Sequence, residues 1–70
     1  MEETARRLYR DLCDCADRWT WTAQARADAH RAVAGQPSAE ALVLRLQASA
    51  AAARAKVYRE AADLLATLDA

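Results

Sequence analysis

Two cysteines and one histidine, Cys13, Cys15 and His30, are the side chains best suited to chemistry. Thiolates and imidazoles bind metals, and thiolates also carry redox reactions. The two cysteines, however, are two positions apart, so on a helix their side chains point in directions about 200° apart. They therefore cannot bind the same metal ion or form a disulfide with each other. A structural zinc site also needs four ligands. We expect packing roles for Cys13 and Cys15, with a metal or redox sensor as an alternative function.

Patterns typical of enzymes and cofactor sites are missing from the chain. No serine or acidic residue is spaced from His30 as in a catalytic triad. A di-iron bundle uses a Glu-x-x-His pair, but no glutamate precedes His30 by three positions. A phosphate-binding loop needs several glycines, and Gly35 is the single glycine of the sequence. The sequence therefore predicts a protein that is not an enzyme and that needs no metal or cofactor.

The charge balance separates the remaining classes of function. The 70 residues form one domain by length, and 10 basic residues balance 10 acidic ones. A chain without net charge is not typical of proteins that bind nucleic acids or membrane surfaces through electrostatics. A nucleic-acid-binding regulator stays as an alternative because arginines recur in the first half of the chain. They are interleaved with acids, and the four nearest the start are Arg6, Arg7, Arg10 and Arg18.

Targeting patterns indicate a cytoplasmic protein. The start, Met1-Glu2-Glu3, is acidic and has no apolar run of a secretory signal after it. No stretch approaches the roughly 20 apolar residues that span a bilayer. Cysteines that cannot pair with each other suit a reducing compartment. We therefore expect no association with membranes.

One break divides the chain into two elements. Gly35 fits the left-handed position after a helix, Pro37 cannot continue the first helix, and Ser38 is a good N-cap for a second one. This pattern predicts an all-α hairpin with helices at about 3–34 and 39–68 and a turn at 35–38. A connection this short makes the two helices antiparallel neighbours.

The first predicted helix has one apolar stripe, with apolar residues at steps of three or four. The stripe runs through Met1, Ala5, Leu8, Leu12, Cys15, Trp19, Ala23, Ala27, His30 and Ala34. Its weak point is the run Trp19-Thr20-Trp21-Thr22, because β-branched and aromatic residues are mediocre helix formers. A break near Thr20 is therefore one interpretation of this segment.

The second predicted helix carries two apolar stripes, about 140° apart. We call the first the leucine stripe: Leu42, Leu46, Ala50, Ala53, Val57, Ala61, Leu64 and Leu68. We call the second the alanine stripe: Leu44, Ala48, Ala51, Ala55, Tyr58, Ala62 and Leu65. The first helix can cover one stripe, and an uncovered stripe is typical of an interface. We expect the alanine stripe to bind a second copy, which gives a homodimeric four-helix bundle.

Trp21 is the best candidate for contact with another protein. On a continuous helix it lies on the charged face, about 180° from Leu12, with Arg18 and Ala25 nearby. Tryptophan and arginine are enriched at binding hot spots. Alternatively, Trp21 stacks under Arg18. The sequence thus predicts a small interaction module, acting as a regulator, adaptor or inhibitor, with a size compatible with a phage-type inhibitor.

Overall fold

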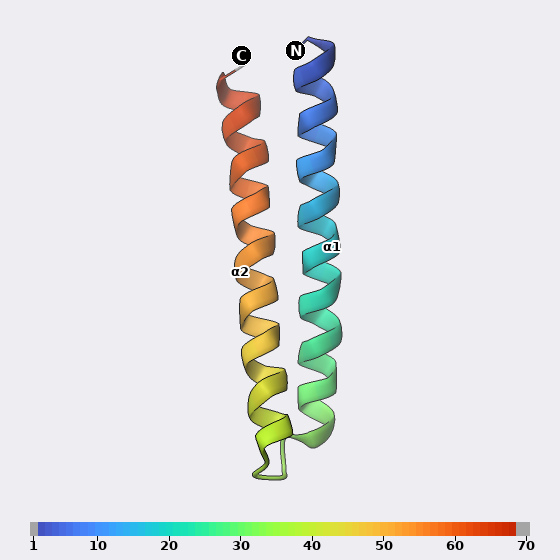
Figure 1. Cartoon of the computed structure of the whole chain (residues 1–70), viewed down its shortest axis with the longest axis vertical. Coiled ribbons are helices and arrows are strands. Elements are labelled where there is room, and N and C mark those ends of the chain that lie inside the picture. Colours follow the sequence, from blue (N-terminus) through green and yellow to red (C-terminus); the bar gives the residue numbers. More distant parts are fainter. Residues whose placement is uncertain (1, 69–70) are drawn as a thin grey trace.

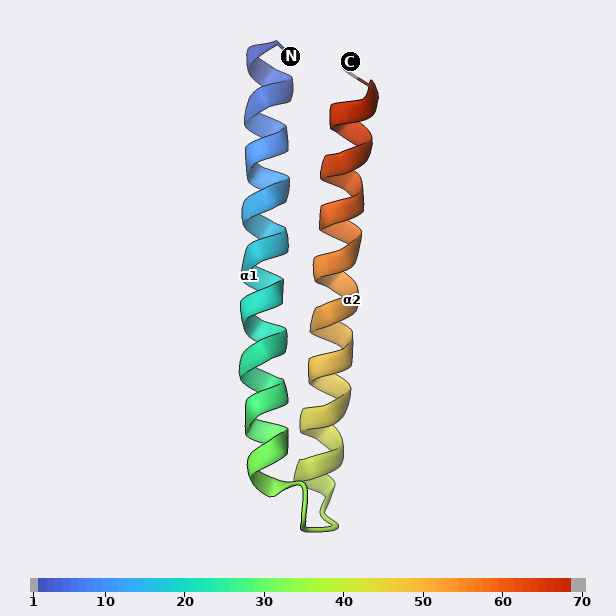
Figure 2. The ribbon, with the colours of Figure 1, turned by 180° about the vertical axis from the view of Figure 1, so that it is seen from behind.

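The computed structural model describes residues 2–68 as two antiparallel helices joined by a short turn (Figure 1). Helix α1 spans Glu3–Val33 and α2 spans Ala39–Leu68. The molecule is a rod of 51 × 14 × 12 Å, with the start of α1 and the end of α2 at one tip. Seen from behind, the helices again lie side by side along their length (Figure 2). The predicted all-α hairpin is confirmed, with helix bounds within one residue of those expected.

Side-chain caps define the start of each helix. The Ala5 amide donates to the Glu2 carboxylate at 2.8 Å, and the Ala41 amide donates to the Ser38 hydroxyl at 3.1 Å. These contacts satisfy amides that the first turn of a helix leaves without a partner. Ser38 therefore has the N-cap role that the sequence predicts.

The end of α1 differs from the expectation for Gly35. A left-handed residue was expected there, but Gly35 does not adopt a positive φ, so this prediction is wrong. The amide of Gln36 instead donates to the Val33 carbonyl at 3.0 Å. That bond takes up a terminal carbonyl without a left-handed residue.

Helix α1 runs without interruption through the weak segment at Thr20. The Thr20 hydroxyl donates to the Ala16 carbonyl at 2.8 Å, and the Thr22 hydroxyl donates to the Arg18 carbonyl at 3.0 Å. Both hydroxyls thus find acceptors four residues back in the same helix. The helix therefore does not break near Thr20, as the expected helix over about 3–34 requires, and the angular positions of Trp19 and Trp21 on the helix are meaningful.

The interface between the helices is built on alanine. The buried apolar residues of the described chain are Ala16, Ala41, Ala51 and Ala62, and within residues 2–68 no large side chain is fully buried. Small side chains at the contact let two helices approach closely. Ala16, next to the predicted stripe of α1, is the fully buried residue of that helix, whereas Leu8 of the stripe remains 49% exposed. Met1, expected on this stripe, lies outside the described residues.

The alanine stripe faces α1. Ala51 and Ala62 are 3% and 1% exposed, and the other members of the stripe are half-buried: Leu44, Ala48, Ala55, Tyr58 and Leu65. These residues therefore pack against α1 within one chain, whereas the sequence predicts contact with a second copy. The physical reason is that alanines at the seam allow a closer approach of α1 than leucines would.

Candidate protein interaction surface

The leucine stripe lies on the outside of α2. Its large side chains are half or more exposed: Leu42 52%, Leu46 56%, Val57 63%, Leu64 59% and Leu68 75%. Monomeric proteins rarely leave so long a row of apolar side chains in water. The free apolar stripe that the sequence predicts is therefore present, but it is the leucine stripe and not the alanine stripe.

The exposed area of the chain is larger than its size requires. A folded monomer of 7.7 kDa exposes about 4,300 Å² by the usual scaling with mass. This chain exposes 5206 Å², so the excess is about 900 Å². A standard protein interface buries about 800 Å² of each partner. The excess, to which the elongated shape of 51 × 14 × 12 Å contributes, is similar in size to the area that one such interface buries.

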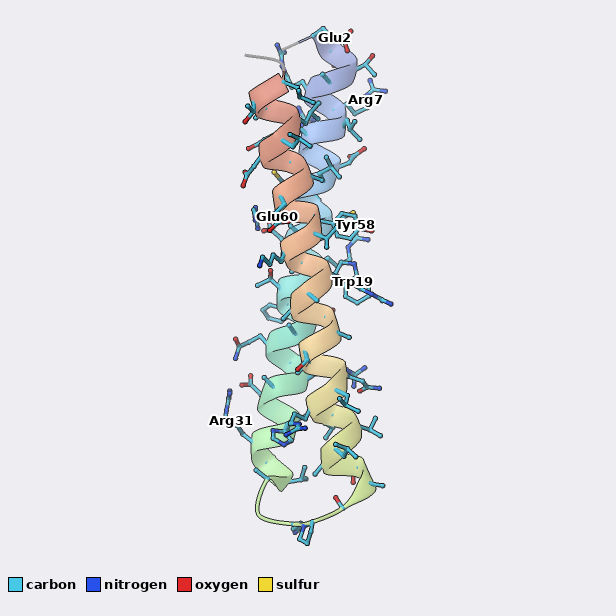
Figure 3. The ribbon with its side chains drawn as sticks, turned by 90° about the vertical axis from the view of Figure 1, so that its left-hand side faces the viewer. Glu2, Arg7, Trp19, Arg31, Tyr58 and Glu60 are labelled. Atoms are coloured by element: carbon cyan, nitrogen blue, oxygen red, sulfur yellow. The ribbon has the colours of Figure 1, made fainter. Side chains whose placement is uncertain are left out.

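A groove runs along one edge of the hairpin, between Trp19 of α1 and the leucine stripe of α2. It has a volume of about 350 Å³ and is lined by Trp19, Ala53, Arg54, Val57 and Tyr58. The Arg54 guanidinium lies over the Trp19 ring, 4.7 Å from its centroid. This cation–π contact covers part of the ring. Trp19 and Tyr58 project on the same side of α2 in Figure 3.

The opposite edge is charged. Arg59 of α2 donates to Asp17 of α1 at 2.7 Å, and Lys56 lies 4.0 Å from Glu60. Arg31 pairs with Asp28 on α1. Glu60 and Arg31 project on the side away from Trp19 and Tyr58 in Figure 3.

Trp21 lies on α1, away from the groove, and is 78% exposed. It lines a shallow cavity of about 220 Å³ with Gln24, Ala25 and Asp28. Ala25, predicted beside it, is thus adjacent, whereas Arg18 is exposed and does not line this cavity. Within residues 2–68, the arginine–tryptophan stacking contact is that of Arg54 with Trp19, so the structure does not show Arg18 covering Trp21.

The cysteines and the histidine do not come together. Cys13 and Cys15 are free thiols, and both are half-buried, as is His30. In the described part of the chain, no three His, Cys, Asp or Glu residues are grouped so that they could hold a metal ion. Hydrogen bonding to Cys13, with smaller effects of its charge and of burial, raises the pKa of Tyr9 above its ordinary value of 10.0.

The arginines proposed for nucleic-acid binding lie within about 120° of one another on the circumference of α1. Arg6, Arg7, Arg10 and Arg18 are all exposed. At 100° per residue, Arg10 lies about 80° from Arg18 and about 60° from Arg7 on the helix circumference. Neither described helix is long and apolar enough to cross a membrane.

Comparison with protein-family models, with curated proteins and with solved structures finds no match. The surface therefore has to be interpreted from its own residues. Sequence reasoning found both stripes of α2 and the exposure of Trp21. It missed the Trp19–Arg54 groove and the Asp17–Arg59 pair, because a cross-helix contact depends on the register between α1 and α2.

Proposed function

We propose that this chain is a non-enzymatic interaction module that acts as a homodimer and binds another protein as a regulator, adaptor or inhibitor. One observation carries the proposal: within residues 2–68 the buried apolar residues are alanines, while the four leucines of the leucine stripe lie outside. This distribution is the reverse of that in a self-sufficient small domain, which buries its large side chains.

Homodimerisation is the simplest way to cover the leucine stripe. A helical hairpin of this size has a thin core, and association is a common remedy for small domains. Two hairpins that pack through α2 would form a four-helix bundle, in which the leucines of both copies become the central core. The excess exposed area of about 900 Å² supports an interface of standard size.

A function beyond self-association needs a second binding surface, and the exposed Trp21 is the best candidate for its centre. The ring lies on α1, so a dimer formed through the leucine stripe of α2 leaves it free. An exposed tryptophan provides a large apolar area with little side-chain entropy to lose. We propose that Trp21 and Ala25 contact the partner protein, with Arg18 at the edge of the same face. The unpaired thiols Cys13 and Cys15 support a reducing, cytoplasmic setting.

Affinity capture from the host cell tests this proposal, with tagged wild-type protein, Trp21→Ala and the control Arg10→Ala. Arg10 is also exposed on α1 but lies three helical turns from Trp21. We expect one specific protein with wild type and with Arg10→Ala. For the complex of the purified protein with its purified partner, Trp21→Ala should raise the Kd by about thirtyfold, which corresponds to a loss of about 2 kcal/mol of binding free energy. Equal capture by Trp21→Ala at unchanged helicity would contradict the assignment of Trp21.

A further inference from the structure

We infer that the second copy packs antiparallel along α2, with the twofold axis beside Ala55. The inference rests on the proposed homodimer and adds the face and the register of its contact. It comes from the exposed leucine stripe, whose four leucines have the same spacing in both chain directions.

The large side chains of the leucine stripe are symmetric about Ala55. Leu42 and Leu68 lie 13 positions on either side of Ala55, and Leu46 and Leu64 lie nine positions on either side. All four are 52–75% exposed. A twofold interface uses one patch on both partners, so that patch must be complementary to itself. An antiparallel helix pair centred at Ala55 meets this condition, because Leu46 lies opposite the partner's Leu64 and Leu42 opposite the partner's Leu68.

The residues in the middle of the leucine stripe also allow close packing of the two copies at the twofold axis. Ala53 and Val57 lie two positions on either side of Ala55, so a small side chain faces a larger one at the centre. Both residues line the groove beside Trp19 as well as belonging to the stripe. A second copy seated here therefore closes the two grooves at the centre of the dimer and covers more of the Trp19 and Tyr58 rings.

Charges and dipoles favour the antiparallel direction over a parallel one. A parallel pair in register also places each leucine beside a leucine of the partner. However, it places each charged side chain of α2 beside the same residue of the partner, and it aligns the two helix dipoles in the same direction, and both effects are repulsive. In the antiparallel pair, Arg45 lies about 30 Å from its copy along the axis, and opposite dipole ends are adjacent. Arg54 lies near its copy in both arrangements, so it does not distinguish them.

Two spin-label distances test the register. Cys13→Ala and Cys15→Ala provide a background without other thiols, and Ser49→Cys and Thr67→Cys, at exposed positions of α2, each carry one label. Pulsed dipolar spectroscopy then measures the distance between the two copies of each label. Circular dichroism and sedimentation of each labelled variant establish that it is helical and dimeric.

The antiparallel register predicts axial separations of about 18 Å at position 49 and about 36 Å at position 67. Two equal distances would show a parallel dimer, and any other unequal pair a different register. Either result overturns this inference and leaves the homodimer standing. A folded 7.7 kDa species without dipolar coupling would overturn the homodimer as well.

Discussion

The Arg59 guanidinium donates a hydrogen bond to the Asp17 carboxylate at 2.7 Å and so links α2 to α1 across 42 positions of sequence. Hydrogen bonding to Asp17 is also the main reason why the pKa of Arg59 is raised above its ordinary value. Both side chains are exposed, at 48% and 70%, and exposed ion pairs add little to stability. We interpret this pair as a contact that favours one register of the two helices on the charged edge.

Asp17→Asn should lower the melting temperature only slightly, because water and salt already screen this pair. The difference in melting temperature between wild type and variant should be smaller in high salt, because salt screens the ion pair that the substitution removes. Thermal melts followed by circular dichroism at two salt concentrations measure it, with Asp14→Asn as the control at an exposed position of α1. A large loss that is independent of salt would contradict the screened character of the contact.

Ala51→Leu should destabilise the hairpin by about 1–3 kcal/mol, because the seam between the helices has no room for a larger side chain. Ala51 is 3% exposed, whereas its neighbour Ala52 is exposed. Ala52→Leu therefore adds the same atoms outside the seam and serves as the matched control. Urea unfolding of both variants measures the free energy of unfolding. Equal stability of the two variants would show that the alanine stripe is not the contact with α1.

Tyr9 should ionise above pH 10.0, because its hydrogen bond to Cys13 favours the neutral phenol. A pKa raised in the folded state means that the contribution of Tyr9 to stability is complete below pH 10 and is lost as pH rises through the folded pKa. Ultraviolet titration of wild type and Tyr9→Phe isolates the Tyr9 transition. In Cys13→Ala this transition should move back toward 10.0. A Tyr9 pKa at or below 10.0 in the wild type would contradict the contact.

The sequence was sufficient to predict what depends on local physics. Pro37 and Ser38 placed the turn and the start of α2, and the apolar periods located both stripes. Periodicity does not tell which stripe contacts α1, since both repeat equally well. That choice depends on how closely two backbones approach, and Ala16 against the alanine stripe allows the closer contact. The Arg54–Trp19 contact additionally required the register, which no local pattern contains.

Sedimentation equilibrium at micromolar concentration tests the homodimer most directly, with wild type, Leu46→Glu and the control Ala52→Glu. Leu46 belongs to the exposed leucine stripe, whereas Ala52 is exposed on α2 outside both stripes. We predict a helical wild-type species of about twice 7.7 kDa, the same mass for Ala52→Glu, and loss of the dimer in Leu46→Glu, because a carboxylate cannot be buried there without a partner. A folded wild-type monomer of 7.7 kDa, or a Leu46→Glu dimer as stable as wild type, would contradict the account.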